Sequence, residues 1–386
     1  MKIVLVGAGG YGVTYFRLME NVVHCLDELC AVVDPYAKQS PSYPRFLELN
    51  IPIYETLEDF FASNAADLVI ISSPIQFHEE QAICAMQNGA HVLCEKPLTA
   101  QLSQALHIQQ VQKETGKIFG VGFQWSFSQT IQKLKSRILS GIYGKPVCLK
   151  TFMSWPREDA YYNSSGWKGR LRDANGMWVM DSIATNATAH YLHNIFYVLG
   201  DDIHTSKMPV SLESSLFKAR PIETFDTCFL RGAFADGSTF LYIATHVGEQ
   251  LVNPIASYAF EKATIEIHDD HVYEKWPDGR IEDLGNVNAQ EEVAQKIFKM
   301  RDAVLHGTQP DCGIDAALPH LKVCNALFEH VPVQAFPAAI THHVTDPASV
   351  EVEGLVAACR DCFERTALPA RDRYTWAADP VCIQLS

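Results

Sequence analysis

The sequence predicts an α/β protein with two domains. A helix-covered parallel sheet comes first, followed by an α/β domain with a large, mostly antiparallel sheet. Over the first domain, short apolar runs alternate with helix-like stretches, the pattern of strands joined by crossover helices. Later runs are instead separated by hairpin turns such as Asp236-Gly237. We therefore place the domain boundary where the pattern changes and predict domains at residues 1–123 and 124–386.

The first strand runs directly into a glycine-rich turn. Residues Lys2–Val6 form an apolar run, Gly7-Ala8-Gly9-Gly10-Tyr11-Gly12 follows, and a helix is predicted over Val13–Val22. In such a turn the first glycine permits the tight bend, the second lets backbone approach a pyrophosphate, and the third lets helix pack on strand. The helix N-terminus then offers free N–H groups to the phosphates. The predicted dinucleotide contacts are Gly7, Gly9, Gly10, Tyr11 and Gly12.

An acidic residue ends the second strand of this domain. The apolar run Cys30–Val33 leads into Asp34. A carboxylate at this place accepts hydrogen bonds from the adenosine ribose and repels a 2′-phosphate. Lys38 lies close enough in sequence to weaken that repulsion, but the pattern favours NAD over NADP as cofactor.

The remaining elements of the first domain alternate in the same way. The predicted helices are Leu57–Ala62, Glu79–Gln87 and Ser103–Thr115, and the predicted strands are Asp67–Ser72, His91–Leu93 and Lys117–Phe123. Pro74 and His78 follow a strand, so they lie on the carboxyl edge where open α/β sheets bind ligands. His78 equally suits a helix cap, and the sequence does not separate these two roles.

Cys94-Glu95-Lys96-Pro97 follows the next apolar run, Ala90–Leu93. A lysine just past a buried strand is unusual, because lysine is normally a solvated surface charge. Pro97 biases Lys96 towards an extended conformation, so that its ammonium group can be aimed at a ligand. A surface turn would explain the tetrapeptide alone equally well. Its position on the carboxyl edge favours a ligand role, and we predict Glu95 and Lys96 as cofactor contacts.

These motifs, together with Val121-Gly122-Phe123, resemble the Gfo/Idh/MocA oxidoreductase family. The resemblance covers about the first 125 residues and extends more loosely to about Gly200. It implies an N-terminal Rossmann domain, a nicotinamide cofactor, and a sugar, inositol or related polyol as substrate. It also implies that Lys96 positions the substrate and transfers its proton. The family further implies a homo-oligomer, a dimer or tetramer, formed through the sheet of the second domain.

The second domain shows hairpin signals and two late helices. The predicted elements are strands Pro146–Met153, Thr227–Phe234, Ser238–His246, Tyr258–Ile267 and His271–Trp276, and helices Gln129–Leu139, Glu291–Val304 and Pro319–Phe328. Pro319 is suitably placed for the first turn of the last helix. The tail from about Pro337 has no predicted role.

Aromatic and cationic residues alternate between Trp155 and Arg170. The glycine, asparagine and serine content of this stretch favours a loop, and loops with such side chains often bind ligands. Aromatic faces and bidentate donors suit a carbohydrate ring and its hydroxyls. Core packing under snorkelling cations, or an oligomer contact, would give the same composition. The predicted substrate contacts here, with one residue near the domain boundary, are Trp125, Arg157, Tyr162, Trp167 and Arg170.

A predicted helix over Asn186–Leu199 carries a polar stripe. Asn186, His190, His193 and Tyr197 recur at helical spacing, and apolar residues occupy the other side. Facing solvent, the stripe would be that of an ordinary amphipathic helix. Facing a ligand, it would supply a histidine as general base for an alcohol, because the pKa of histidine lies near neutrality. Two imidazoles without a third ligand do not make a zinc site, so no metal is predicted.

The resemblance implies an Asp-x-x-x-His pattern followed by an acid in this helix, and the chain departs from it. His190 matches the histidine, whereas Asn186 stands in place of the aspartate and His193 in place of the later acid. An amide orients an imidazole but does not stabilise its charged form as a carboxylate does. Ser126 likewise stands where an arginine is common. We predict Lys96, His190 and Asn186 as catalytic residues and Asp181 and His193 as substrate contacts.

Charge and composition narrow the function classes. The net charge of −14 opposes binding to a nucleic-acid backbone, and no apolar run reaches the ~18 residues of a membrane span. Of the 11 cysteines most are isolated, and Cys359-Arg360-Asp361-Cys362 has no second pair to complete a zinc site. Free thiols, with no signal peptide before the first strand, predict a cytoplasmic protein.

The sequence therefore predicts an NAD(H)-dependent dehydrogenase that oxidises a hydroxyl of a sugar, inositol or glycoside, with Lys96 and His190 sharing the proton. Two alternatives use the same residues. One is a glycosidase that oxidises a glycoside transiently and eliminates its aglycone. The other is a non-catalytic protein that binds NAD or a sugar as a sensor. The predicted partners are a small-molecule sugar or polyol and further copies of the chain, with no nucleic acid and no membrane.

Overall fold

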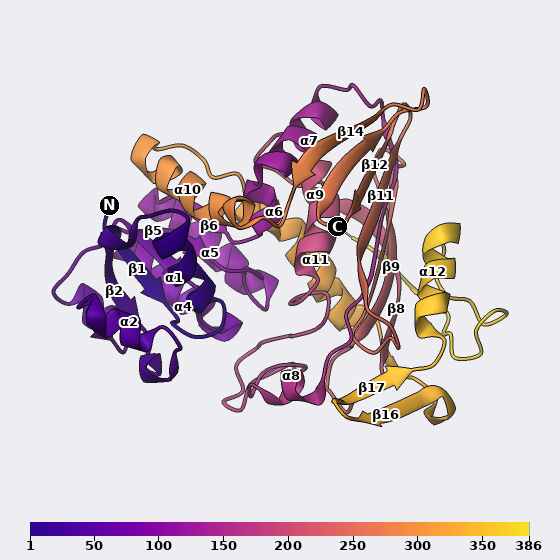
Figure 1. Ribbon diagram of the computed structural model, residues 1–386, viewed down its shortest axis with the longest axis horizontal. Helices are drawn as coiled ribbons and strands as arrows, with labels where there is room; N and C mark the ends of the chain where they lie inside the picture. The colour runs from indigo at the N-terminus through magenta and orange to yellow at the C-terminus, as the bar shows by residue number, and fades with distance from the viewer. Residues whose placement is uncertain (386) are drawn as a thin grey trace. The chain divides into compact units, whose positions relative to one another are not determined.

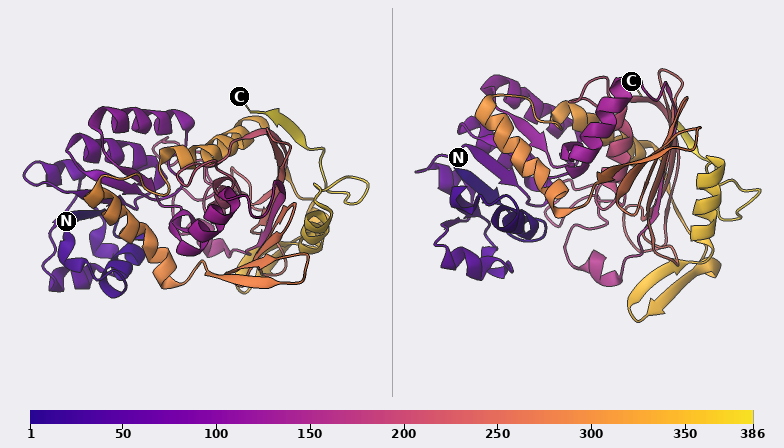
Figure 2. Two further views of the ribbon diagram at one scale, coloured as in Figure 1. Left: turned by 90° about the horizontal axis from the view of Figure 1, so that it is seen from above. Right: turned by 45° about the horizontal axis from the view of Figure 1, so that its top comes forward.

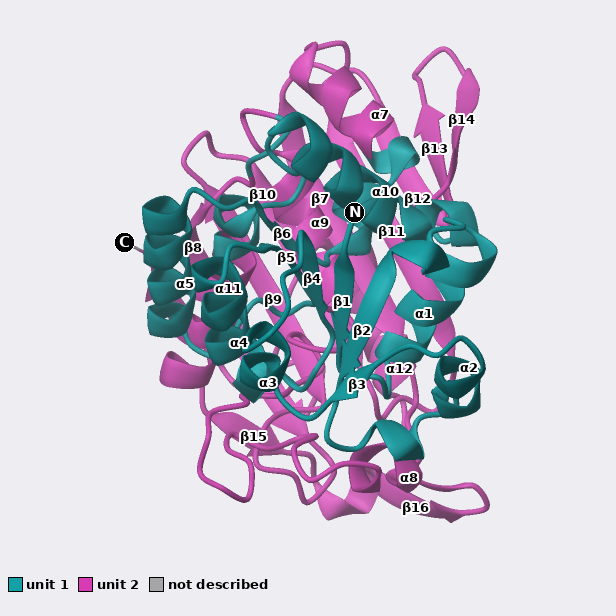
Figure 3. Cartoon of the chain, turned by 90° about the vertical axis from the view of Figure 1, so that its left-hand side faces the viewer, with its two compact units in different colours: residues 1–131, 203–205, 288–318 teal, residues 132–202, 206–287, 319–386 magenta. Residues whose placement is uncertain are grey.

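The computed structural model describes residues 1–385, which form two compact units (Figures 1 and 3). Unit 1 comprises residues 1–131, 203–205 and 288–318, and unit 2 comprises residues 132–202, 206–287 and the chain from Pro319 onward. The segment 288–318 therefore lies outside the unit to which the sequence assigned it. Its helix α10 (Gln290–His306) packs against α1 (Gly12–Asn21) and α6 (Gln124–Phe127). No helix in residues 1–385 is both long enough and apolar enough to cross a membrane.

Unit 1 contains a parallel sheet, as the sequence predicted, and it has six strands in the order β3-β2-β1-β4-β5-β6. Its strands are β1 (Ile3–Val6), β2 (Leu29–Val33), β3 (Ile53–Tyr54), β4 (Leu68–Ile71), β5 (His91–Cys94) and β6 (Phe119–Val121). Strand β1 is buried throughout, because helices cover both faces. The strand order reverses between β1 and β4, and ligands bind at such a switch point in doubly wound folds.

The helices of unit 1 follow the predicted alternation, with some additions. They are α2 (Tyr43–Glu48), α3 (Leu57–Phe61), α4 (His78–Gln87) and α5 (Leu102–Thr115), besides α1, α6 and α10, with short 3₁₀ turns at Leu26–Glu28, Ala37–Gln39 and Ile75–Phe77. The sequence missed α2 and β3. Strand β3 has two residues, too few to show a period.

Unit 2 contains a ten-stranded mixed sheet, mostly antiparallel as predicted, in which β7 pairs in parallel with β10 and β8 with β15. The strands are β7 (Pro146–Ser154), β8 (Pro209–Lys218), β9 (Thr227–Phe234), β10 (Thr239–Thr245), β11 (Val252–Phe260), β12 (Thr264–His268), β13 (His271–Lys275), β14 (Ile281–Asn286), β15 (Val333–Ala335) and β18 (Val381–Gln384). The helices are α7 (Gln129–Leu139), α8 (Asp159–Asn163), α9 (Ala189–Val198), α11 (Ile314–His330) and α12 (Leu355–Arg365). Asp236-Gly237 forms the β9–β10 turn, with Gly237 at φ +85°.

Both faces of this sheet are covered by the chain itself. On β10, Phe240 contacts Phe196 of α9, and the hydroxyl of Tyr242 bonds that of Thr188, which precedes α9. The alternate residues Leu241 and Ile243 face an apolar cluster that α12 contributes to. Figures 1 and 2 show α12 and the hairpin of β16 (Thr341–Thr345) and β17 (Ala348–Val352) on the face opposite α9.

The tail without a predicted role thus completes the core of unit 2. Phe217 of β8 stacks on Phe336 and meets Trp376 edge-on, both from the C-terminal segment. The family resemblance implied oligomer contacts through this sheet, but the tail occupies one of its faces. The homo-oligomer stays a prediction.

Three predicted elements in the second half were wrong at their boundaries. The strand predicted over Tyr258–Ile267 is two strands, because the chain turns at residues 261–263 without glycine or proline. Helix α11 begins at Ile314, so Pro319 lies inside it rather than in its first turn. Helix α9 begins at Ala189, which leaves Asn186 in the preceding turn.

Candidate functional site

The glycine-rich turn of unit 1 has the geometry that its sequence predicted. Gly7 adopts φ +83°, and a Cβ atom there would lie 2.7 Å from the backbone nitrogen of Ser73. A Cβ atom at Gly12 would lie 1.9 Å from the carbonyl oxygen of Gly7. Neither position therefore admits a side chain, because backbone atoms occupy the space.

Gly9 and Gly10 differ from these two glycines because they face open space. Both are exposed, and a Cβ atom at either would meet no atom within 4 Å. Within residues 1–385, no backbone carbonyl accepts a hydrogen bond from the N–H of Gly9, Gly10 or Tyr11. A row of free N–H groups before the N-terminus of α1 forms a cradle that fits a pyrophosphate.

Asp34 lies at the end of β2, and its hydrogen bonds fix the backbone at the edge of this cradle. Its Oδ2 atom accepts a hydrogen bond from the N–H of Ala8 at 2.7 Å, and Oδ1 accepts one from the N–H of Tyr36 at 2.7 Å. The hydroxyl of Ser40 donates to the carbonyl of Ala8 at 2.6 Å. Each carboxylate oxygen retains a lone pair that could accept a hydrogen bond from a ribose hydroxyl.

His78 connects two loops on the carboxyl edge of the sheet. Its Nε2 atom lies 3.0 Å from the carbonyl oxygen of Ser73, and Nδ1 lies 3.1 Å from that of Pro97 and 3.2 Å from that of Leu98. The ring is buried, and burial lowers its pKa. These contacts give His78 a positioning role for the loop after Lys96, whereas Pro74 is exposed beside it.

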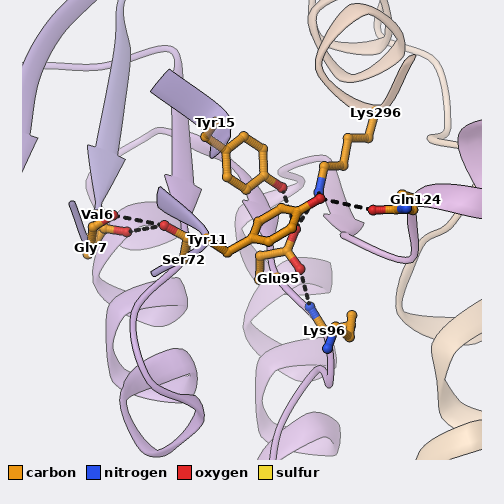
Figure 4. A network of polar contacts seen from close by, with 9 residues as sticks. All are labelled: Val6, Gly7, Tyr11, Tyr15, Ser72, Glu95, Lys96, Gln124 and Lys296. Atoms are coloured by element: carbon orange, nitrogen blue, oxygen red, sulfur yellow. Dashed lines mark hydrogen bonds and ion pairs between the residues drawn. The ribbon is translucent and has the colours of Figure 1, made fainter. Parts of the chain in front are cut away.

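A buried ionic network lies directly beside Lys96 (Figure 4). Oε1 of Glu95 accepts hydrogen bonds from the Tyr15 hydroxyl at 2.8 Å and from the Lys296 ammonium at 2.5 Å. Oε2 of Glu95 accepts one from the backbone N–H of Lys96 at 3.2 Å. Lys296 is fully buried, and its ammonium also lies 4.3 Å from the ring centres of Tyr11 and Tyr15.

The electrostatics of this network keep Lys296 charged. Burial alone would lower the pKa of Lys296, but Glu95 and Tyr11 outweigh it and raise that pKa. Burial and Glu95 raise the pKa of Tyr15 well above its ordinary value, so it stays a hydrogen-bond donor. The Tyr11 hydroxyl donates to Oε1 of Gln124 at 2.9 Å. The predicted cofactor contacts Tyr11 and Glu95 are therefore held by the protein's own groups.

Lys296 is a residue of this network that the sequence did not reveal, as are Tyr15 and Gln124. Lys296 lies on α10, which the sequence assigned to the other domain, and no motif surrounds it. The signal in the sequence was the apolar spacing of Ala294, Ile297 and Met300. All three are buried in the structure, so a lysine between them lies on or beside an apolar face.

Trp125 is also held within unit 1. Its side chain is buried, and its indole N–H donates to Oδ1 of Asn288 at 2.9 Å. This hydrogen bond ties α6 to the segment before α10 and gives the predicted substrate contact a structural role.

In unit 2, the polar stripe of the predicted helix divides into two environments. Asn186 and His190 are half-buried, and Nδ2 of Asn186 donates to the Tyr161 hydroxyl at 3.2 Å. His193 is fully buried and stacks on Tyr197 with ring centres 5.6 Å apart. Burial, together with His320 and Lys135, lowers the pKa of His193 well below its ordinary value. His193 therefore fits a packing role within unit 2 better than the predicted substrate contact.

The aromatic segment of unit 2 forms a compact loop. The Tyr162 hydroxyl and Nδ1 of His246 share a hydrogen bond of 2.8 Å. Oδ2 of Asp181 accepts one from the N–H of Gly169 at 2.6 Å. Trp167 is half-buried and Arg170 exposed. Of the predicted substrate contacts, Tyr162 and Asp181 are thus largely engaged in holding the loop together.

The described chain forms no metal site, and the cysteine pair of the Cys359-Arg360-Asp361-Cys362 motif is buried. Residues 1–385 contain no group of three or more His, Cys, Asp or Glu side chains placed to hold a metal ion. Cys359 and Cys362 are buried on α12, and burial raises the pKa of each thiol. Both belong to the apolar cluster under α12.

Comparison with known proteins finds a matching family model and several relatives of similar sequence. Residues 1–123 match the model of an oxidoreductase family with an NAD-binding Rossmann fold, Gfo/Idh/MocA. An inositol 2-dehydrogenase from Corynebacterium glutamicum (strain R) is 28% identical over 169 residues, which cover 43% of this chain and 49% of the relative. A scyllo-inositol 2-dehydrogenase (NAD(+)) from Bacillus subtilis (strain 168) is 39% identical over 99 residues, 26% of this chain and 28% of the relative. The matches thus span half or less of these curated relatives.

A solved structure extends the likeness to most of the chain. An oxidoreductase from Agrobacterium radiobacter in complex with NAD+, L-tartaric acid and magnesium has a TM-score of 0.72. The match covers 85% of this chain and 95% of that chain at 18% identity. At this identity the likeness concerns the fold, and it includes both the parallel and the mixed sheet.

Proposed function

Residues 1–123 form an NAD-binding Rossmann domain of the Gfo/Idh/MocA oxidoreductase family, and from that premise we propose that this protein is an NAD(H)-dependent dehydrogenase. Its substrate would be a hydroxyl of a sugar, inositol or related polyol. The inositol dehydrogenases among the relatives favour that class. The observation that carries the proposal is the cradle at Gly9, Gly10 and Tyr11, with Asp34 at its rim.

Different residues of the cradle suit different parts of the NAD molecule. The backbone N–H groups of Gly9, Gly10 and Tyr11 would bind the pyrophosphate, and Asp34 would accept the adenosine ribose hydroxyls. Asp34 would also repel a 2′-phosphate, which supports NAD over NADP. When bound, NAD supplies the hydride acceptor for oxidation of a hydroxyl.

We assign the uptake of the substrate's hydroxyl proton to two residues of the chain, Lys96 and His190. Lys96 follows β5, and its backbone is fixed by Glu95 on one side and by the His78 contacts to the next loop on the other. His190 is the half-buried histidine of α9, in the turn after Asn186. A positioned amine or imidazole that takes up this proton typically contributes about 10²–10⁴ to the rate. Asn186, which contacts Tyr161, would orient the substrate.

The test is absorbance of reduced nicotinamide after NAD is mixed with sugars, inositols and aryl glycosides. Steady growth with one class of polyol is expected. A flat trace with release of the aglycone would overturn the dehydrogenase in favour of the redox-assisted glycosidase. Binding of NAD or a sugar without any product across the whole polyol panel would instead favour a sensor.

A further inference from the structure

Two cations lie against the ring of Tyr161 in unit 2. The guanidinium carbon of Arg157 is 4.9 Å from the centre of its ring, and the ammonium nitrogen of Lys168 is 4.2 Å from it. All three side chains are half-buried. We call Arg157, Tyr161 and Lys168 the Tyr161 clamp.

Neither cation of the clamp forms a salt bridge with an acidic side chain. No salt bridge in residues 1–385 includes Arg157 or Lys168, and Lys168 donates to the neutral Ser164 hydroxyl at 2.7 Å. Nε of Arg157 is buried and has no hydrogen-bond partner in the described chain. Arg220 shows the contrast, because it pairs with Asp159 in the same region.

The surrounding acidic groups offset the positive charge of the clamp only in part. Asp181 gives an oxygen to the N–H of Gly169, and Asp226 accepts the backbone N–H groups of Ala219 and Arg220. His246 lies beneath Tyr161, and burial, followed by Arg157 and Arg220, lowers its pKa well below the ordinary value. Burial also lowers the pKa of Lys168, with Asp181 opposing and Arg157 adding to that effect. Two cations against one ring repel each other, as the effect of Arg157 on the pKa of Lys168 shows, and a bound anion would relieve the repulsion.

We propose that the Tyr161 clamp binds the carboxylate of an acidic sugar or polyol. This inference rests on the proposed function, because it names the substrate class of the same enzyme. A guanidinium presents parallel N–H donors that match the two oxygens of a carboxylate, and the ammonium adds a second charge-assisted hydrogen bond. Tyr161 supplies a flat face that holds both cations in place.

Calorimetric titration of the full chain, saturated with NADH so that no hydride acceptor is present, tests the proposal with matched acid and neutral ligands. The pairs are D-glucuronate with D-glucose, D-galacturonate with D-galactose, and D-gluconate with D-glucitol. At least one acid should bind about tenfold or more tightly than its neutral partner. Arg157→Gln and Lys168→Met should each weaken that acid about tenfold and change the neutral partner by less than about twofold.

Arg172→Gln is the matched control. Arg172 belongs to the same loop and stacks on Trp178 at 3.5 Å, but it is exposed and donates to the carbonyl of Gly176. Its replacement should leave the acid's affinity unchanged. NAD titration of each variant confirms that the protein is folded.

Three outcomes would overturn the clamp: acids that bind no better than their neutral partners, variants that weaken both partners equally, or D-glucose 6-phosphate preferred over D-glucuronate. Because binding is measured without turnover, acid binding without formation of NADH would contradict the dehydrogenase alone. Turnover of neutral sugars with no preference for acids would contradict the clamp alone.

Discussion

Lys296 in unit 1 and the Tyr161 clamp in unit 2 both place cations against tyrosine rings, but they differ in their charge partners. Lys296 is fully buried and bonded to Glu95. Arg157 and Lys168 are half-buried and form no salt bridge in the described chain. Burial of a charge is tolerated when the protein supplies the counter-charge, as around Lys296. Where the chain supplies none and solvent still reaches the group, a ligand can complete the pair.

The largest expected effect is on stability, from Lys296→Met. This change leaves Glu95 buried without its cation and should lower the free energy of unfolding by about 3–5 kcal/mol. Urea unfolding of the full chain, followed by circular dichroism, measures it. Lys299→Met is the control on the same helix, because Lys299 pairs with Asp311 at a more exposed place and should cost under about 1 kcal/mol.

A double variant decides whether the charge itself is responsible. In Lys296→Met combined with Glu95→Gln, no unpaired carboxylate is left, so part of the lost stability should return. If the double variant is as unstable as Lys296→Met plus the separate loss from Glu95→Gln, the ion pair is not what stabilises this region.

Lys96, the neighbour of this network in sequence, should show the opposite behaviour. Lys96→Met should lower kcat about a hundredfold or more and leave both the unfolding free energy and NAD affinity nearly unchanged. His190→Ala should lower kcat to a similar extent. Steady-state kinetics with the best polyol, together with NAD titration, measure these effects. Unchanged turnover in either variant would remove that residue from proton handling.

Asp226 of unit 2 gives a smaller and pH-dependent effect. Burial raises its pKa to about 6, although backbone N–H groups and Arg220 oppose the shift. The folded protein therefore holds this proton more tightly than the unfolded chain, in which the pKa is about 4. Stability should fall as the pH rises between those values, by up to about 1.4 kcal/mol per pH unit.

Asp226→Asn should remove that slope. Unfolding free energies of both proteins between pH 4 and pH 7, taken as a difference, cancel the other titrating groups. Equal slopes in the two proteins would show that Asp226 titrates normally in the folded state.

The sequence predicted what local stereochemistry dictates. Gly7 and Gly12 were predictable because backbone atoms fill the space where their Cβ atoms would lie, and Asp34 because it ends the strand beside them. Lys296 was not predictable, since its partner Glu95 is distant in sequence and a helical lysine normally lies at the surface.

The start of α9 escaped prediction for a different reason. The side chains of Ser182, Thr185 and Thr188 bond nearby backbone groups and hold the chain in turns before the helix begins. Helical spacing alone could not show that His193 packs inside unit 2 while Asn186 contacts Tyr161.

The smallest expected effects distinguish the roles of the adjacent residues Tyr161 and Tyr162. The sequence predicted Tyr162 as a substrate contact, but its hydroxyl is bonded to the buried His246, whereas Tyr161 carries the two cations. Tyr162→Phe should lower the free energy of unfolding by about 1 kcal/mol, because His246 loses its hydrogen bond, and should not change the affinity for D-glucuronate. Tyr161→Leu should weaken D-glucuronate severalfold, because Arg157 and Lys168 lose the ring that orients them. The reverse result would make Tyr162 the ligand contact after all, and the absence of a partner for Arg157 and Lys168 would then have no bearing on substrate choice.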